Sequence, residues 1–159
     1  ADIFEGGHRI PFIVNWPKEI HKNQVSDELI SSIDIMASLA SLVNYELPNN
    51  AAEDSFDFSI LFFENQDNNY SREALIHHSV DGTFSIRKGN WKFIEGNNSG
   101  GWRIGPESKF KSNSEGQLYD LESDPKEQIN LFENKPEVVK ELSELLNSYR
   151  ENSRSIPLN

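Results

Sequence analysis

The sequence has no cysteine among its 159 residues. This excludes disulfides, thiolate metal sites and a cysteine nucleophile within these residues, and it leaves the redox compartment undefined. Apolar runs are also short, and none approaches the roughly 20 residues that a membrane-spanning helix needs. The first residues, Ala1-Asp2-Ile3-Phe4, have neither the basic start nor the apolar stretch of a signal peptide. We therefore predict no membrane span. No localisation is predicted either, because an export signal for the periplasm or for secretion would lie upstream of Ala1.

Positive charge is scarce, with 15 Lys and Arg against 26 Asp and Glu, which gives a formal net charge of -11. Such a surface repels a phosphate backbone, so nucleic acid is excluded as a partner. The chain does contain bulky core material, since ten Phe, four Tyr and three Trp fall within its 36% of apolar residues. This composition indicates a globular protein.

The first part of the chain carries two apolar elements. Ile10 to Pro17 is a short apolar run bounded by prolines, which is typical of a strand buried in a parallel sheet. Apolar residues at helical spacing then predict a helix at about 34 to 45, with Asp34 or Ser32 as its N-cap. Both elements are more apolar than a free hairpin could bury, so we expect them to complete a larger α/β sheet.

The second part follows a polar, Asn-rich connection at residues 66–70 and has a different pattern. Three short strands separated by tight turns are predicted at 74–80, 83–87 and 91–95, with Asp81-Gly82 as a hairpin signal. A Gly-, Ser- and Asn-rich loop precedes a fourth strand at 117–121, and an amphipathic helix is predicted at about 136 to 150. These elements predict a four-stranded antiparallel sheet with a helix packed on it.

Three stretches, in this order, resemble the C-terminal third of the sulfatase family. The Glu-Gly-Gly segment, Phe4 to Phe12, is similar to aromatic-Glu-Gly-Gly-x-Arg-hydrophobic-Pro in that family. The Trp-Lys segment, Ile86 to Ile94, is similar to Arg-x-Gly-x-Trp-Lys. The Asp-Pro segment, Leu118 to Leu131, is similar to Leu-Tyr-Asp-Leu-x-x-Asp-Pro-x-Glu-x-x-Asn-Leu. The order and spacing of all three make a sulfatase, of the alkaline-phosphatase-like superfamily, the expected family.

The resemblance implies an α+β fold in two parts. Residues 1–65 would form the C-terminal part of an α/β catalytic domain, to which the predicted strand and the first helix belong. Residues 66–159 would form the C-terminal sulfatase subdomain, with the four-stranded antiparallel sheet and the packed C-terminal helix. The N-terminal part of the same catalytic domain is then the expected partner.

The reaction implied by the resemblance is hydrolysis of a sulfate ester on an aryl compound or a carbohydrate. A formylglycine, made in a Cys/Ser-x-Pro-x-Arg motif, would attack sulfur beside a calcium ion. The two Ser-x-Pro sequences here, at 123–125 and 155–157, lack the Arg, and the family's sulfate-binding Lys would lie immediately before Ala1. The resemblance therefore predicts no catalytic residue, metal ligand or cofactor within this chain, and no activity by the chain alone.

The candidate site residues form a scaffold set and a substrate set. Glu5, Gly6, Gly7 and Arg9 are expected to shape the edge of the active site, with Glu5 bonding Arg9 or backbone amides. His8, at a variable position of the motif, is expected on the surface.

The substrate set consists of histidines and one loop pair. His77 and His78 would point to opposite faces of their strand, so that one of them could bind sulfate or a sugar hydroxyl. Trp102 and Arg103 would suit an anionic sugar, because the ring can stack on the sugar and the cation can meet sulfate.

Two other functions remain open from the sequence. The chain could belong to a phosphodiesterase or phosphonate hydrolase of the same superfamily, or it could be a module that binds a sulfated glycan without cleaving it. The nucleophile encoded upstream of Ala1 would distinguish these alternatives.

Overall fold

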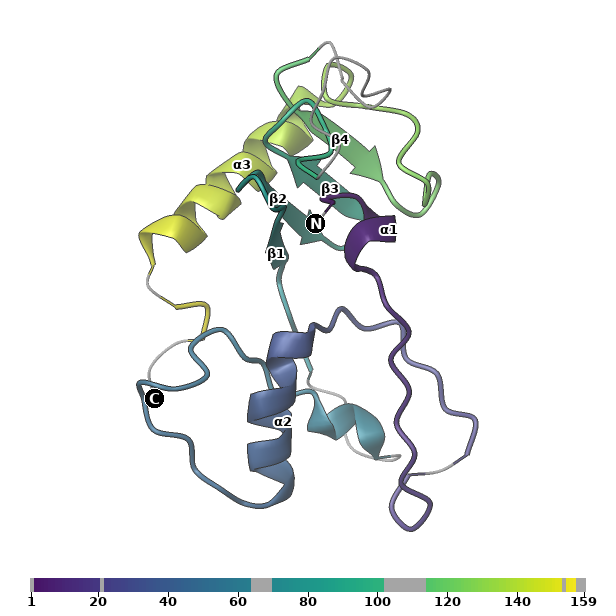
Figure 1. Ribbon diagram of the computed structural model, residues 1–159, viewed down its shortest axis with the longest axis vertical. Helices are drawn as coiled ribbons and strands as arrows, with labels where there is room; N and C mark the ends of the chain where they lie inside the picture. The colour runs from purple at the N-terminus through teal and green to yellow at the C-terminus, as the bar shows by residue number, and fades with distance from the viewer. Residues whose placement is uncertain (1, 21, 64–69, 102–113, 153, 157–159) are drawn as a thin grey trace. The chain divides into compact units, whose positions relative to one another are not determined.

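The computed structural model describes the chain in two compact units. The sheet unit comprises Ala1–Pro11 and Ala74–Ser148, and the helical unit comprises Phe12–Glu73 and Tyr149–Asn159. Figure 1 shows the elements of both units along the chain. The described residues are 2–20, 22–63, 70–101, 114–152 and 154–156.

The sheet unit is built on four antiparallel strands in chain order. They are β1 (Leu75–His78), β2 (Phe84–Lys88), β3 (Trp91–Ile94) and β4 (Gln117–Asp120). The two-residue turn between β2 and β3 starts with Gly89 at φ +56°, a conformation that glycine adopts without steric cost. The predicted four-stranded meander is therefore confirmed, with strand ends shifted by up to two residues.

The register assigns each side chain of the sheet to one of two faces. His77 pairs with Ser85, Arg87 with Lys92, and Lys92 in turn with Tyr119. Because paired residues share a face and side chains alternate along a strand, these residues lie on one face, called here the ionic face. The other face, called here the helix face, carries His78, Ile86, Phe93 and Leu118.

Helix α3 (Pro136–Glu151) packs on the helix face, as its apolar spacing predicts (Figure 1). Its residues Leu142 and Leu146 are almost fully buried, as are Ile86 and Leu118 of the sheet. An exposed ion pair between Lys88 Nζ and Glu141 Oε1, at 3.0 Å, joins the same face to the helix. The predicted C-terminal helix is thus confirmed together with its apolar face.

The ionic face is covered by the start of the chain. Ile3 forms a buried cluster with Ile94 and Tyr119, and the Ile3 N–H donates to the carbonyl of Ser99 at 2.9 Å. The one-turn helix α1 (Glu5–His8) follows directly. The sheet is therefore packed on both faces, by α3 on one and by residues 2–8 on the other.

The helical unit contains η1 (Ser32–Asp34), α2 (Ile35–Leu42) and η2 (Ser59–Phe62). The predicted N-cap at Asp34 is confirmed for α2, although the Asp34 side chain makes no cap bond to that helix and forms a capping box with Ser31 around η1 instead. Asp34 is fully buried. Its side chain also accepts the N–H of Phe56 at 3.0 Å and forms an ion pair with Arg72. The predicted helix is confirmed, but it ends at Leu42.

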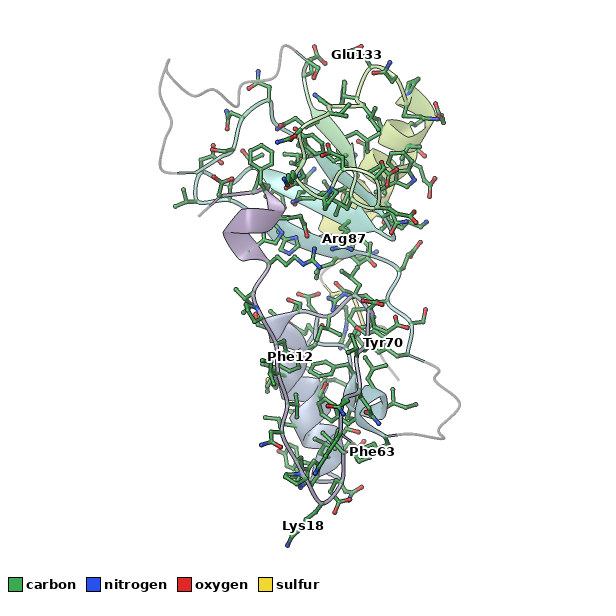
Figure 2. The ribbon with its side chains drawn as sticks, turned by 90° about the vertical axis from the view of Figure 1, so that its right-hand side faces the viewer. Phe12, Lys18, Phe63, Tyr70, Arg87 and Glu133 are labelled. Carbon is green, nitrogen blue, oxygen red and sulfur yellow. The ribbon has the colours of Figure 1, made fainter. Side chains whose placement is uncertain are left out.

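The strand predicted from Ile10 to Pro17 is not formed. Ile13 is 88% exposed, and no strand pairs with this stretch within the described part of the chain. A strand needs a hydrogen-bonded neighbour, which the pattern of one segment cannot supply. Helix α2 also leaves apolar side chains outside, with Leu39 56% exposed, and Figure 2 shows the side chains of this unit around Phe12 and Phe63.

The compact units do not follow the boundary predicted at residues 65 and 66, since residues 1–11 pack with the sheet. The assignment of residues 1–65 to a catalytic domain concerns a longer protein and stays a prediction. No helix in the described ranges has the length and apolar character needed to cross a membrane.

Candidate functional site

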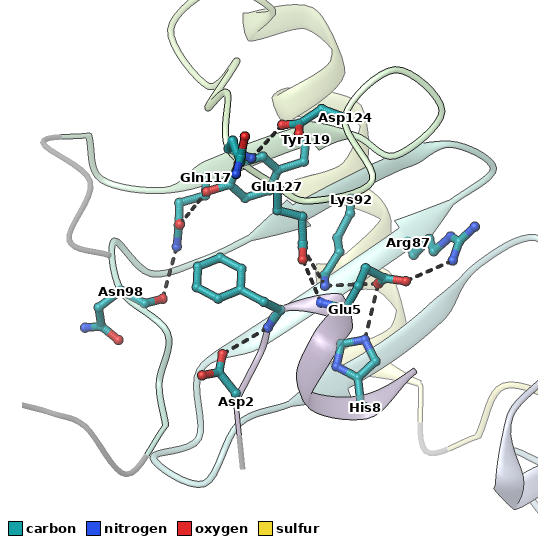
Figure 3. Close-up of polar contacts among 12 residues, drawn as sticks. Asp2, Glu5, His8, Arg87, Lys92, Asn98, Gln117, Tyr119, Asp124 and Glu127 are labelled. Atoms are coloured by element: carbon teal, nitrogen blue, oxygen red, sulfur yellow. Dashed lines mark hydrogen bonds and ion pairs between the residues drawn. The ribbon is translucent and has the colours of Figure 1, made fainter. Parts of the chain in front are cut away.

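Charged residues from the three motif segments meet on the ionic face of the sheet. Glu5 comes from the Glu-Gly-Gly segment, Arg87 and Lys92 from the Trp-Lys segment, and Glu127 from the Asp-Pro segment (Figure 3). We call these four residues the charge cluster. Segments up to 122 residues apart in sequence are thus joined by two carboxylates and two cations.

Lys92 lies at the centre of the charge cluster and is fully buried. Its Nζ donates to Glu5 Oε1 at 3.1 Å and forms an ion pair with Glu127 Oε1 at 2.8 Å. The second contact is purely an ion pair, since Glu127 Oε1 accepts no hydrogen bond within the described residues. A buried ammonium is costly unless it is paired, so Lys92 depends on both carboxylates.

Glu127 also binds the backbone of the opposite segment. Its Oε2 accepts the N–H of Glu5 at 2.6 Å, at the first residue of α1. A carboxylate is favourable at a helix start, where backbone N–H groups lack partners. Glu127 therefore contacts both the side-chain network and the backbone of the Glu-Gly-Gly segment.

The Asp-Pro segment places this carboxylate by a tight local turn. Asp124 Oδ2 accepts the N–H groups of Gln128 and Ile129, each at 2.7 Å, and the Asp124 carbonyl accepts the N–H of Glu127. Glu127 itself has φ +53°, in the left-handed region that non-glycine residues rarely adopt. The turn thus holds a glutamate in an unfavourable backbone conformation with its carboxylate on Lys92.

Asn130 fixes the end of the same segment against β4. Its Oδ1 accepts the N–H groups of Leu118 and Phe132, both at 3.0 Å, and its Nδ2 donates to the Gly116 carbonyl at 3.2 Å. A side-chain amide can satisfy backbone groups that have no strand partner. The Asn-Leu that ends the segment therefore has a structural role in the turn.

Glu5 is ionised despite its burial. Burial alone would raise the pKa of Glu5, but the hydrogen bond from His8 and the charges of Lys92 and Arg87 outweigh it and lower the pKa to about 2. Arg87 Nη1 lies 3.3 Å from Glu5 Oε2, and His8 Nε2 lies 3.3 Å from Glu5 Oε1. The expected partner Arg9 is instead exposed, so that pairing is corrected to Arg87 and Lys92.

His8 and His77 pack against each other beside Glu5. Their ring centroids are 3.9 Å apart, with the planes tilted by 32°. Burial lowers the pKa of His77 to about 3, and the neighbouring His8 and Lys92 add to the effect. His77 is thus neutral at pH 7, and its buried Nδ1 has no partner among the described residues. The expectation that His8 lies on the surface is met only in part, because its side chain is 20% exposed and contacts Glu5 and His77.

His78 lies on the opposite side of the strand, as the alternation predicts. It is exposed, its Nδ1 lies 3.0 Å from the carbonyl of Ser79, and its ring is 5.8 Å from that of Phe84. The structure therefore brings His77, and not His78, to the Glu-Gly-Gly segment.

The two glycines of that segment differ. A Cβ at Gly7 would lie 2.5 Å from the Asp2 carbonyl oxygen, whereas a Cβ at Gly6 would meet no atom within 4 Å. Gly7 is thus required for close packing of the chain start, in line with the predicted tight loop. Trp102 and Arg103 lie outside the described residues.

Sequence reasoning missed Arg87, Lys92 and Glu127 as members of a cluster. Each one belongs to a motif quoted above, but their partners lie in other segments, so spacing along the chain gave no signal. The charge alternation offered one hint, because Lys92 interrupts an otherwise apolar strand between Trp91 and Phe93. In the part of the chain that the structure describes, no group of three or more His, Cys, Asp or Glu could hold a metal ion.

Comparisons with known proteins point to one family. Residues 2–152 match the family model "N-sulphoglucosamine sulphohydrolase, C-terminal". The chain is 40% identical over 148 residues to an N-acetylgalactosamine-6-O-sulfatase of Bacteroides thetaiotaomicron, covering 92% of the chain and 28% of that protein. It is 32% identical over 158 residues to human arylsulfatase A, covering 89% of the chain and 30% of that enzyme. The chain thus spans less than a third of these relatives.

Solved structures show the same fold. One, from work on the metabolism of multiple glycosaminoglycans by Bacteroides thetaiotaomicron, superposes with a TM-score of 0.76 at 40% identity, covering 93% of this chain and 30% of that chain. Another, a protein in complex with its substrate D-glucosamine-2-N,6-O-disulfate, has a TM-score of 0.64 at 22% identity and covers 89% of this chain and 29% of that chain. The chain therefore belongs to the sulfatase family and corresponds to its C-terminal region.

Proposed function

We propose that the chain is the pocket-bordering C-terminal part of an enzyme that hydrolyses sulfate esters of carbohydrates. The observation that carries this proposal is the 40% identity, over 92% of the chain, to an N-acetylgalactosamine-6-O-sulfatase. A 6-O-sulfated hexosamine is therefore the substrate class that we infer, with the sulfate ester bond as the bond cleaved.

His77 is the substrate-binding candidate that the geometry favours. It lies beside the Glu-Gly-Gly segment, which the resemblance places at the edge of the active site, whereas His78 lies on the helix face. A neutral imidazole can donate one hydrogen bond to a sugar hydroxyl or a sulfate oxygen, but it does not form an ion pair. His77 would thus orient the substrate, and the charge on sulfate would be balanced elsewhere. Trp102 and Arg103 stay candidates for contacts with the sugar.

The scaffold role of Glu5, Gly6, Gly7 and Arg9 belongs to the same proposal. Glu5 and Gly7 have the contacts expected of such a role, since one enters the charge cluster and the other allows close packing on Asp2. Gly6 has open space around its Cα, which would suit approach of a substrate to the backbone.

The remainder of the catalytic domain is the partner that we infer for the helical unit. Large apolar side chains of this unit are exposed, among them Ile13 at 88%, Val43 at 71% and Leu39 at 56%. Large exposed apolar side chains in such number are a feature of protein interfaces. Since the chain covers only 28% of the Bacteroides relative, the remaining part of such a protein is the natural cover for this face.

The calcium ion and the formylglycine of the family would be supplied by that remaining part. The described residues offer no set of ligands that fits a calcium ion, so no step is assigned through it here. The contribution of this chain would be to shape the pocket and orient the substrate.

The test is an assay of the protein encoded with the residues upstream of Ala1. We expect sulfate release, measured by ion chromatography, from N-acetylgalactosamine-6-sulfate, and less from nitrocatechol sulfate. Hydrolysis of bis(4-nitrophenyl) phosphate without sulfate release would instead identify a phosphodiesterase. Binding of the sulfated sugar without turnover would identify a glycan-binding module.

The chain of 159 residues by itself serves as the matched control. We expect it to release no sulfate from either compound. Calcium-dependent turnover by a pure sample of this chain would contradict the assignment of the chemistry to upstream residues.

A further inference from the structure

We propose that Glu127 and Lys92 are positioning residues that fix the Glu-Gly-Gly segment, and with it the His8–His77 pair, at the edge of the substrate pocket. The inference rests on the proposed function, because it assigns a role in that reaction to two residues that do not touch substrate. It begins from the way in which α1 is attached to the sheet.

Helix α1 is too short to hold its own conformation. It has four residues, and a side-chain cap is absent at its start. Short helices gain almost nothing from internal hydrogen bonds, since nucleation is unfavourable. The conformation of residues 5–8 must therefore come from contacts with the sheet unit.

Glu127 provides two of these contacts at once. Its Oε2 accepts the N–H of Glu5, and its Oε1 faces the Lys92 ammonium that also binds the Glu5 side chain. The backbone and the side chain of one residue are thus held by a single carboxylate–ammonium pair (Figure 3). Such a two-point attachment fixes orientation as well as position.

The attachment continues to the imidazole pair. Glu5 Oε1 bonds His8 Nε2 at 3.3 Å, and the His8 ring packs on His77 with a centroid distance of 3.9 Å. Loss of the Glu127 contact would release the Glu5 backbone and leave the Glu5 side chain held by Lys92 and Arg87 alone, which would loosen His8 and, through it, the ring of His77. Glu127 differs from the other members of this series because it also bonds the backbone of α1.

The backbone of Glu127 supports a role beyond simple packing. A residue with φ +53° is energetically unfavourable unless it is glycine, and such residues concentrate at functional sites. The Asp124 side chain accepts two N–H groups of the same turn, which stabilises this conformation. The turn is thus built around the placement of one carboxylate.

The experiment compares Glu127→Ala with a matched variant, Glu141→Ala, in the full-length protein. Glu141 also pairs with a lysine, but its side chain is 60% exposed and lies on the helix face. Steady-state kinetics on the sulfated sugar give kcat and KM. Hydrogen exchange followed by mass spectrometry reports on peptides that cover residues 2–9 and residues 117–121.

We expect Glu127→Ala to lower kcat by about 10²-fold, the loss that a misplacement of about 1 Å can cause, with a smaller change in KM. Exchange of residues 2–9 should rise about tenfold or more, as expected for a lost hydrogen bond to a charged group, while residues 117–121 keep their protection. Glu141→Ala should leave all these values near wild type. Glu127→Gln, which keeps an oxygen acceptor, should restore part of both the kcat and the protection.

Three results would overturn the positioning role. The first is a wild-type kcat in Glu127→Ala, and the second is a lost kcat with unchanged exchange of residues 2–9. The third is an equal rise of exchange in all peptides, which would assign the pair to general stability. A wild-type protein that releases no sulfate would refute the proposed function instead, and the exchange contrast would still decide whether Glu127 fixes the segment.

Discussion

The two units of the chain bury their apolar residues to different degrees. In the sheet unit both faces of the sheet are covered, and Ile86, Ile94, Leu118 and Leu146 are fully buried. In the helical unit, Ile13, Leu39 and Val43 are more than half exposed. Both units nevertheless contain buried ion pairs. Lys92 pairs with Glu5 and with Glu127 in the sheet unit, and Arg72 pairs with Asp34 in the helical unit.

This difference indicates which unit is complete by itself. The sheet unit pairs the buried charges of its charge cluster and covers both faces of its sheet within its own residues, and its exposed apolar side chains, Ile10, Val80 and Ile129, lie outside the strands. The helical unit satisfies Asp34, but it leaves an apolar surface that water must hydrate. We therefore expect the sheet unit to be the independently stable part, and the helical unit to gain stability from the remaining catalytic domain.

The largest expected effect is that of Lys92→Met in the sheet unit. Removal of the ammonium leaves Glu5 and Glu127 buried without their shared cation, and breaking such a pair costs about 3–5 kcal/mol. The free energy of unfolding from urea titration, followed by circular dichroism, measures this loss. The control is Lys88→Met, whose exposed pair with Glu141 should contribute at most about 1 kcal/mol. Equal losses in both variants would contradict the account.

A second pair of variants compares the apolar packing of the two units directly. Leu146→Ala empties a fully buried site under the sheet and should cost about 2–5 kcal/mol. Leu39→Ala, on the 56% exposed face of α2, should change the stability of the 159-residue chain by less than about 0.5 kcal/mol. In the full-length protein the cost of Leu39→Ala should become clearly larger. An equally small stability loss for Leu39→Ala in the full-length protein would show that this face of α2 is not covered by the rest of the protein.

Arg72→Met tests the buried pair of the helical unit and should have a smaller effect. Asp34 would keep the N–H donors of Ser31 and Phe56, so the expected loss is about 2 kcal/mol, the scale of one hydrogen bond to a charged group. Limited proteolysis should detect this loss as faster cleavage within residues 22–63, even where circular dichroism shows little change. Asp34→Asn is the matched variant, since it removes the charge of the other partner. Faster cleavage in the sheet unit, and not in the helical unit, would contradict a local effect.

Among these predictions, a change of pH near neutrality should have the smallest effect on the free energy of unfolding. The pKa of Glu5 is lowered in the folded state to about 2, so its stabilisation is present above its ordinary pKa of 4.5 and is lost as the pH falls from 4.5 towards 2. His77, with a folded pKa of about 3, has the same sign over the range from 6.5 down to 3.

Urea titrations at several pH values measure this loss. Glu5→Gln should flatten the lower part of the range, and His77→Gln the upper part. A free energy of unfolding that rises as the pH falls would contradict this prediction.

Much of the sheet unit could be predicted from the sequence, because its signals are local. Asp81-Gly82, Gly89-Asn90 and the helical spacing after Pro136 each act within a few residues. The predicted strand at Ile10 to Pro17 was wrong for the opposite reason, since its apolar run needs a neighbouring strand that the described residues do not contain.

The candidate site was predicted only in part. Its segments were found from motifs, and Glu5 and His77 were among the named residues. The charge cluster was not found, because Lys92 and Glu127 are joined by the fold and not by spacing. Their pairing needs the strand register that places Lys92 on the ionic face and the turn that gives Glu127 its positive φ.

A double-mutant cycle on Lys92 and Glu127 tests the charge cluster most directly. The free energy of unfolding is measured for wild type, Lys92→Met, Glu127→Gln and the double variant. Because the residues share one buried contact, we predict a coupling energy of about 1–3 kcal/mol, with the double variant more stable than the sum of the single losses implies. Additive losses within about 0.5 kcal/mol would show that Lys92 and Glu127 do not act together, and would contradict the account.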